Sequence, residues 1–125
     1  MKKRLSSKEL YKKGERLRED DRHLQALQVL DEGIVKSQEE GQYRNLVDCL
    51  KAKVLTWKHL YLLTKDSSYR ILAKKAAESM LDVTQEFSLK DKYHTSYFRL
   101  GEIDMLYEDF AFAIRHYKKA IETYV

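Results

Sequence analysis

Apolar side chains recur at intervals of three and four residues along most of this 125-residue chain, the spacing that gathers them on one face of an α-helix. Short polar segments interrupt the pattern, and Lys65-Asp66-Ser67-Ser68 is the clearest of them. The pattern therefore predicts six helices, at about residues 7–19, 22–38, 42–64, 67–87, 91–106 and 110–125.

The same pattern predicts where these helices begin and which faces they bury. Residues suited to cap a helix N-terminus stand before four of the helices: Ser6 or Ser7, Asp20-Asp21, Asp66 or Ser67, and Asp91. The expected inward residues of the second helix are Leu24, Leu27, Leu30 and Ile34. Those of the fourth helix are Ile71, Leu72, Ala76, Met80, Leu81 and Val83.

Composition supports an all-α chain. There is no proline, there are only four glycines, and 35% of the residues are charged. Proline and glycine are the residues that disfavour helix interiors most strongly, so their scarcity removes the usual helix breakers. At this length the chain is expected to form one small domain, covering residues 1–125.

The last third of the chain contains a spaced set of aromatic and small residues. Tyr97 precedes the pair Leu100-Gly101, and Ala113 follows Gly101 by twelve residues. Tyr117 and Ala120 then follow Ala113 at helical intervals. Small side chains at Gly101 and Ala113 would allow two helices of a hairpin to cross closely. The same spacing recurs near the N-terminus, in a set that consists of Leu10, Gly14, Leu17, Ala26, Leu30 and Gly33.

These two segments resemble the tetratricopeptide (TPR) repeat, whose pattern has an aromatic, a Leu-Gly pair, and then an alanine and an aromatic four residues apart. The resemblance implies antiparallel helical hairpins at about 7–38, 42–87 and 91–125, stacked as a right-handed solenoid of six helices. The middle hairpin departs from the pattern. If Ala52 is its small residue, Ala76 follows only after 24 residues, and both middle helices must be longer than their neighbours.

TPR domains usually bind peptides or proteins on a concave face lined by the first helix of each hairpin, and the resemblance implies such a partner here. Counted from the small residues Gly14, Ala52 and Gly101, the expected groove residues are Tyr11, Glu15, Arg18, Cys49, Lys53, Thr56, Trp57, Phe98, Glu102 and Met105. The subtype that clamps the two carboxylates of chaperone tails needs Lys and Asn where Tyr11 and Glu15 stand, so that subtype is rejected.

No constellation for catalysis or metal binding is visible in the sequence. The four histidines, His23, His59, His94 and His116, are dispersed, and none forms a metal-ligand pair one helical turn apart. There is no Gly-rich phosphate loop, and the single cysteine, Cys49, is expected in the middle of a helix. We therefore expect no enzyme activity, no metal and no cofactor.

Net charge is +4, and the local basic excess is at the start of the chain, in Lys2, Lys3, Arg4, Lys8, Lys12 and Lys13. A basic helical-repeat module that binds nucleic acid is the alternative function, although the interspersed acidic residues count against it. No apolar stretch is long enough to span a membrane. The lone cysteine excludes an internal disulfide, so a reducing, cytoplasmic location is expected.

The sixth helix carries more large apolar residues than one inward stripe can hold. Its surplus residues include Phe112, Ile121 and Tyr124, which would leave a second face partly apolar. Two explanations remain open, namely self-association as a homodimer and continuation of the chain in a longer repeat array.

Overall fold

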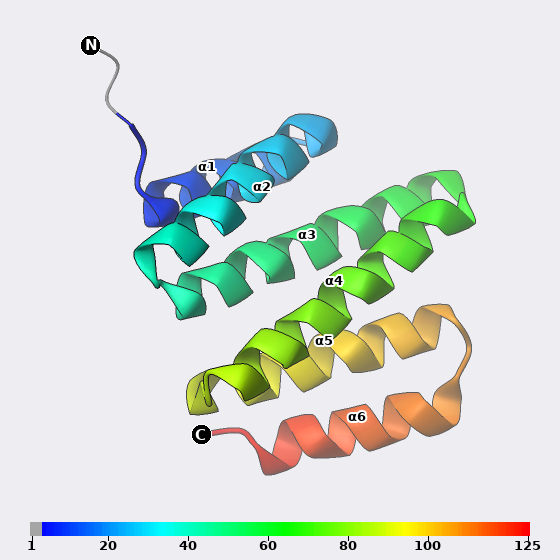
Figure 1. Cartoon of the computed structure of the whole chain (residues 1–125). Helices are drawn as coiled ribbons and strands as arrows, with labels where there is room; N and C mark the ends of the chain where they lie inside the picture. Colours follow the sequence, from blue (N-terminus) through cyan, green and yellow to red (C-terminus); the bar gives the residue numbers. More distant parts are fainter. Residues whose placement is uncertain (1–3) are drawn as a thin grey trace.

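The computed structural model describes residues 4–125, which fold into six α-helices, one short 3₁₀ helix and no β-strand (Figure 1). The all-α prediction is therefore confirmed. The elements in chain order are α1 (Ser7–Glu19), α2 (His23–Glu40), α3 (Tyr43–Thr64), α4 (Ser67–Glu86), η1 (Lys90–Lys92), α5 (Tyr93–Leu106) and α6 (Phe110–Glu122).

The helices pack as three successive antiparallel pairs, α1 with α2, α3 with α4, and α5 with α6 (Figure 1). Contacts between α2 and α3 and between α4 and α5 join each pair to the next. In addition, α3 contacts both α1 and α5, so the first helices of the three pairs are neighbours. The middle pair is longer than its neighbours, as expected, with 22 and 20 residues in α3 and α4 against 13 in α1 and 13 in α6.

Two of the predicted N-caps are confirmed. Ser6 Oγ accepts a hydrogen bond from the Glu9 amide at 3.1 Å, and the Glu9 side chain accepts one from the Ser6 amide, which together form a capping box before α1. Asp66 accepts a hydrogen bond from the Ser68 amide at 2.9 Å and caps α4. Both caps are local in sequence, which is why the pattern predicts them correctly.

The other two predicted caps are wrong. Asp20 ends α1 and Asp21 has a left-handed backbone with φ of 62°, while the residue before α2 is Arg22, whose side chain makes no capping hydrogen bond. Asp91 lies inside η1, and its carboxylate accepts a hydrogen bond from Arg44 Nε at 3.0 Å instead of capping α5. In both places a tight turn inserted before the helix displaces the acidic residue from the capping position.

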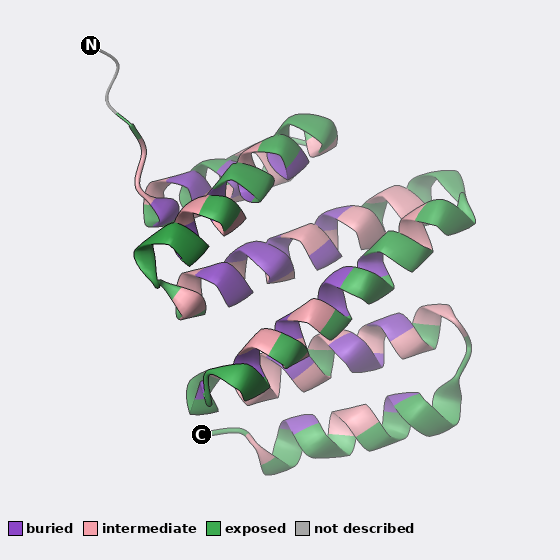
Figure 2. Cartoon of the chain, viewed as in Figure 1, coloured by how far each residue is buried: buried purple, intermediate pink, exposed green. Residues whose placement is uncertain are grey.

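The main core lies between α3, α4 and α5, along the inner faces coloured as buried in Figure 2. It consists of Leu46, Val47, Leu50, Val54, Ala73, Ala76, Ala77, Met80, Leu89, Leu100 and Ile103. A smaller cluster of Leu30, Cys49 and Ala52 joins α2 to α3. Burial of this apolar surface is the main force that holds the pairs together.

Three residues predicted to face inward are exposed. Leu24 is 72% exposed and lines a surface depression with Leu60, because it lies in the first turn of α2. Ile71 and Leu72 are also exposed. In this first part of α4 the inward positions belong to Tyr69, which stacks on Trp57, and to Arg70, which donates to the Leu106 carbonyl at 3.2 Å.

Glycines lie at the crossings of the outer pairs. A Cβ atom added at Gly14 would be 2.5 Å from Leu30 Cδ2, and one added at Gly101 would be 2.7 Å from Tyr117 Cε1. Ala26 and Ala113 are buried as well. The small residues that the sequence places at helix crossings therefore do lie at close contacts, where any larger side chain would push the helices apart.

Candidate functional site

The first helices of the three pairs contribute adjoining side chains to one surface, because α3 contacts both α1 and α5. We call this surface the first-helix face. Its residues are Tyr11, Glu15, Arg18, Asp48, Leu55, Lys58, Arg99 and Glu102, which are linked by the contacts described below. An extended surface is available because the first helices of the three pairs lie side by side.

On α1, the predicted residues Tyr11, Glu15 and Arg18 lie half-buried on this face. Arg18 donates two hydrogen bonds to the Glu15 carboxylate, at 2.8 and 3.2 Å, in a bidentate ion pair that fixes both side chains. Tyr11 packs against the cluster of α2 and α3 residues that contains Cys49. Burial, with the nearby Glu15 and Asp48 carboxylates, raises the pKa of Tyr11 to about 12.

Charged side chains tie α3 to α5 across the first-helix face. Lys58 on α3 donates to Glu102 on α5 at 3.0 Å, and Arg99 donates to the other oxygen of Glu102. Further along, Lys92 in η1 donates to Asp48 on α3 at 3.0 Å. These partly buried pairs orient the side chains, and they neutralise most of the charge that the face carries.

The predicted α3 residues do not lie on this face. Cys49 and Thr56 are fully buried, so a ligand bound at the surface would not reach them. Lys53 pairs with Asp31 of α2 at 2.7 Å. Trp57 packs on the main core and stacks on Tyr69 of α4, with ring centroids 5.6 Å apart. These four residues therefore face α2, α4 or the interior.

The four predicted α3 residues lie off the first-helix face for one reason. Ala52, the reference for these positions, packs in a cluster with Leu30 of α2 and Cys49 of α3. Val54 instead lies in the core that α3 shares with α4. Counting from Val54 places Leu55 and Lys58 where Glu15 and Arg18 lie on α1. Sequence reasoning missed these two residues because it required a small residue at the crossing.

On α5, Glu102 belongs to the first-helix face, while Phe98 and Met105 are exposed beside it. The Phe98 ring packs toward α6, 5.6 Å from the Tyr117 ring, and the Arg99 guanidinium lies 5.3 Å from its centroid. Phe98 is therefore at the edge of the face, accessible to a partner that extends from α5 toward α6.

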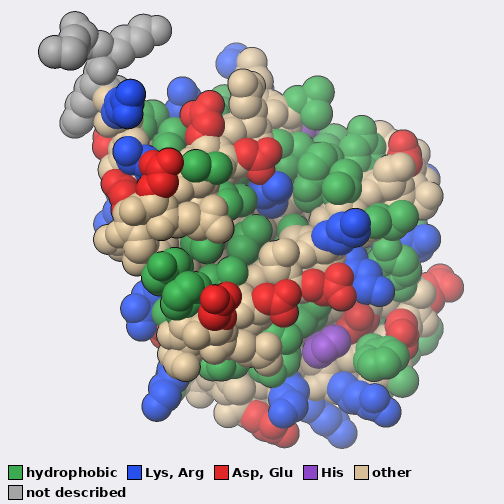
Figure 3. Space-filling view, in the orientation of Figure 1, with side chains coloured by type: hydrophobic (Ala, Val, Ile, Leu, Met, Phe, Trp, Pro, Cys, Tyr) green, Lys and Arg blue, Asp and Glu red, His purple; other side chains and the backbone are tan. Residues whose placement is uncertain are grey.

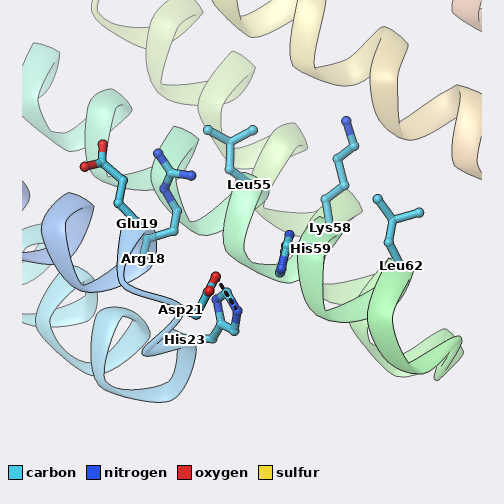
Figure 4. Close-up of a pocket in the computed structure, with 8 residues that line it drawn as sticks. All are labelled: Arg18, Glu19, Asp21, His23, Leu55, Lys58, His59 and Leu62. Carbon is cyan, nitrogen blue, oxygen red and sulfur yellow. Dashed lines mark ion pairs between the residues drawn. The ribbon is translucent and has the colours of Figure 1, made fainter.

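A hollow of about 380 Å³ opens at one end of the first-helix face (Figure 4). Its walls come from the end of α1, the α1–α2 turn, the start of α2 and α3, and consist of Arg18, Glu19, Asp21, His23, Leu55, Lys58, His59 and Leu62. A second hollow, of about 530 Å³, lies toward the start of α1 and α3 and includes Tyr11, Asp48 and Arg44. The first-helix face therefore has a hollow at each end and charged side chains between the two hollows.

Two of the four histidines meet in the first of these hollows. The rings of His23, at the start of α2, and His59, on α3, have centroids 4.7 Å apart, and Asp21 Oδ1 lies 3.9 Å from His23 Nε2. Burial, and then the neighbouring His59, lower the pKa of His23. The sequence expectation of dispersed histidines overlooked this pair because the two residues come together only through packing of α2 on α3.

The cysteine is a buried free thiol. Burial, reinforced by the Asp48 and Glu15 carboxylates, raises the pKa of Cys49 to about 12. Reactive cysteines need a lowered pKa and access to solvent, because the thiolate is the nucleophile. Cys49 has neither property, so it serves as a packing residue between α2 and α3.

Large apolar side chains of α6 and the residues after it are exposed, as the surplus of large residues predicts, while Arg115, Lys118 and Glu122 are exposed on the side of α6 opposite the buried Ala113 and Ala120. Phe112 is exposed, and Ile121 and Tyr124 are 75% and 69% exposed. Phe110 and Ile114 on the same helix are exposed as well. We call these five residues the α6 outer surface. Of these residues, Phe110, Ile114 and Ile121 share one side of α6 by their helical spacing, and large apolar side chains exposed together are typical of a contact surface.

Charges of both signs are interspersed on the face of the molecule shown in Figure 3. Of the N-terminal basic residues, Lys2 and Lys3 lie outside the described residues, and Arg4 and Lys8 are exposed. No helix among residues 4–125 is long and apolar enough to cross a membrane.

Comparison of this chain with protein-family models, with curated proteins and with solved structures found no match. The resemblance to TPR repeats therefore stays a hypothesis that depends on the spaced residues and on the helix packing.

Proposed function

We propose that this chain is a TPR-like protein-interaction module, in which three hairpins stack as a right-handed solenoid and a peptide or protein partner binds the first-helix face. The observation that carries the proposal is the adjoining placement of α1, α3 and α5, which leaves half-buried, oriented side chains of both charges between two hollows. Such a surface suits an extended segment with alternating charge. The buried thiol and the charge pairing of this face favour binding over covalent chemistry.

Several residues have definite roles under this proposal. Arg18 and Lys58 would bind acidic groups of the partner. Glu15 and Glu102 hold these two cations in place and would bind basic groups of the partner. Tyr11 would donate a hydrogen bond, and Leu55 would provide apolar contact. Aromatic and arginine side chains at the centre of an interface usually contribute most of its binding energy.

Nucleic-acid binding is the weaker alternative. A nucleic-acid surface needs a continuous excess of lysine and arginine side chains along the phosphate backbone, without carboxylates among them. On the first-helix face the cations Arg18, Lys58 and Arg99 are each paired with a carboxylate.

The reducing cytoplasmic location expected from the lone cysteine is also part of the proposal.

The test compares two charge-reversed chains of equal net charge. Arg18→Glu with Lys58→Glu changes the first-helix face, and Lys75→Glu with Lys118→Glu changes exposed positions on α4 and α6. Wild-type and variant chains would be used to capture partners from cell extract, with crosslinking to locate the bound surface. We expect the first pair to abolish capture of a partner that the second pair retains, with the helical circular dichroism spectrum unchanged in both. Equal capture by both variants would move the site off this face.

A second candidate function, self-association, is favoured by the α6 outer surface. A homodimer that buries Phe112, Ile121 and Tyr124 of both copies would remove them from water. Sedimentation of the isolated chain across a concentration range measures this directly. We expect a dimer that Phe112→Glu or Tyr124→Glu converts to a monomer. A wild-type chain that stays monomeric at high concentration would leave this surface to a different protein or to a continuing repeat array.

A further inference from the structure

Three potential metal ligands converge at the junction of α1, α2 and α3. Asp21, His23 and His59 each offer one ligand atom, and these atoms all lie within 4.8 Å of one another. Figure 4 shows their side chains approaching from the α1–α2 turn, the start of α2 and α3. A metal ion bound at about 2.0–2.2 Å by each of three ligands holds those ligand atoms roughly 3–3.5 Å apart, so small side-chain rotations are sufficient to close the site.

Neither ring nitrogen of His23 makes a hydrogen bond within the described part of the chain. His23 Nδ1 is buried and has no hydrogen-bond partner among the described residues. The other ring nitrogen, Nε2, is 3.9 Å from Asp21 Oδ1, which is too long for a hydrogen bond. A buried polar atom without a partner is costly and uncommon in proteins, so the His23 ring has the capacity to bind an additional group.

The backbone holds these ligands in place. His23 is the first residue of α2, and His59 lies within the long helix α3. The Asp21 amide donates to the Arg18 carbonyl at 3.0 Å, and the Arg22 amide donates to the Leu17 carbonyl at 2.9 Å, which fixes the turn between them. Ligands on a fixed backbone lose little conformational entropy when they bind an ion.

Nearby charges are balanced well enough to admit a cation. Arg18 and Lys58 line the same hollow, but each is engaged by a carboxylate, Glu15 at 2.8 Å and Glu102 at 3.0 Å. Glu19 adds a further acidic side chain to the wall.

We propose that Asp21, His23 and His59 bind one divalent metal ion of the zinc class, which links the α1–α2 turn to α3. Two imidazole nitrogens and one carboxylate oxygen suit Zn²⁺, Ni²⁺ or Cu²⁺, whereas Mg²⁺ and Ca²⁺ prefer oxygen ligands throughout. Three protein ligands leave a fourth position of a tetrahedral Zn²⁺ for water or for a donor group of a bound partner. All three ligands line the 380 Å³ hollow. The site is independent of whether the first-helix face binds a protein.

The four histidines supply a matched experiment. Untagged full-length chain would be titrated with Zn²⁺ by calorimetry at neutral pH, as wild type, as His23→Gln, as His59→Gln and as a double control, His94→Gln with His116→Gln. We expect one Zn²⁺ per wild-type chain, a loss of affinity of roughly tenfold or more in each single variant, and affinity within about threefold of wild type in the control. Mg²⁺ should show no binding in any of them.

Asp21→Asn guards against variants that fail to fold. Asp21 is exposed, and asparagine tolerates its left-handed backbone, so this substitution removes the charge with little effect on the fold. It should weaken Zn²⁺ binding while the melting temperature of the metal-free chain stays unchanged. Added Zn²⁺ should raise the melting temperature of wild type and control more than that of the site variants at the same Zn²⁺ concentration, because an ion that binds only the folded state stabilises it.

The Co²⁺-loaded wild-type chain gives an independent readout. It should show visible absorption bands of a low-symmetry nitrogen and oxygen site, and both single histidine variants should lose them. Zn²⁺ affinity that is unchanged in folded His23→Gln and His59→Gln, or that is lost only in the His94 and His116 control, would overturn the proposal. Loss in one of the two site variants but not the other would also contradict a shared site.

Discussion

The outer helix pairs and the middle pair achieve close packing in opposite ways. In α1–α2 and α5–α6 the first helix contributes a glycine, and the second contributes a large side chain that lies over it, Leu30 on Gly14 and Tyr117 on Gly101. In α3–α4 the first helix contributes Val54 and the second contributes the small residues Ala73 and Ala77. Two helices can approach closely when either one presents a small surface, so the small residue need not be on the first helix.

This reversal explains why the TPR-like spacing is visible at both ends of the chain and not in the middle. It also displaces the surface of α3. With Val54 and not Ala52 toward the partner helix, Leu55 and Lys58 face outward between α1 and α5, and Trp57 turns toward Tyr69 of α4. Which helix of a pair contributes the small residue therefore decides which residues of the first helix a ligand can contact.

The largest effect is expected from filling the glycine crossings of the outer pairs. Gly14→Leu and Gly101→Leu should each lower the free energy of unfolding by about 3 kcal/mol, because the new side chain must displace Leu30 or Tyr117. Ala113→Leu, at a buried position of α6, should cost roughly 1–3 kcal/mol for the same reason. Urea denaturation followed by circular dichroism measures these values.

Glu122→Leu is the matched control on the same helix pair. Glu122 is exposed at the end of α6, so a leucine introduced there meets no close neighbour and should be nearly neutral. If the crossing variants and this control melted alike, the glycines would not lie at tight crossings.

In the middle pair the opposite change should destabilise. Val54→Ala removes buried methyl groups from the large side of the α3–α4 contact, and the cavity should cost about 2 kcal/mol. Val35→Ala on α2 provides the comparison, because Val35 is exposed and the same deletion there should be almost without effect. Equal urea midpoints for these two variants would show that Val54 is not the packing residue of α3.

A smaller effect distinguishes the turns before and after α3. Gly41 and Lys65 both follow a helix in the left-handed conformation, with φ of 68° and 60°. Lys65→Gly should stabilise the chain by about 0.5 kcal/mol, since glycine adopts this conformation without strain, and Gly41→Ala should destabilise it by about 1 kcal/mol. Thermal melts of the two variants should shift in opposite directions, and a shift of the same sign would contradict this explanation.

The smallest effect concerns pH at the contact between the α1–α2 turn and α3. Burial and His59 lower the pKa of His23, Arg18 acts in the same direction, and Asp21 opposes them. The unfolded chain therefore takes up a proton at His23 at higher pH than the folded chain. Its contribution to stability is complete above the ordinary pKa of about 6.5 and is lost as the pH falls toward the lower, folded value.

Urea denaturation at about pH 7.5 and at about pH 5.5 compares stability above and below the ordinary pKa of histidine. The loss of stability between the two should be smaller in His23→Gln than in wild type. Glu19 and Lys58 line the same hollow and are unchanged in this variant, so they serve as an internal background. An equal loss in both chains would assign the acid sensitivity to other groups.

Local signals in the sequence predict most of the secondary structure. The capping box of Ser6 and Glu9 and the Asp66 cap lie within three residues of their partners, so they could be recognised without a fold. Asp21 and Asp91 resemble caps equally well, but a left-handed turn and a 3₁₀ helix remove them from the capping position. Leu24 has helical spacing and is nevertheless exposed, because spacing does not say where the neighbouring helix ends.

The sequence by itself determined six helices, their approximate lengths and the small residues of the outer crossings, because these depend on the period of the helix and on neighbouring residues. Only the tertiary structure decided which side of α3 is exposed. It also brought Lys58 to Glu102, and His23 to His59 and Asp21. Those contacts join residues on different helices, and their formation depends on the rotation of each helix about its axis. Packing against several neighbours at once sets that rotation, and no single segment of the chain contains it.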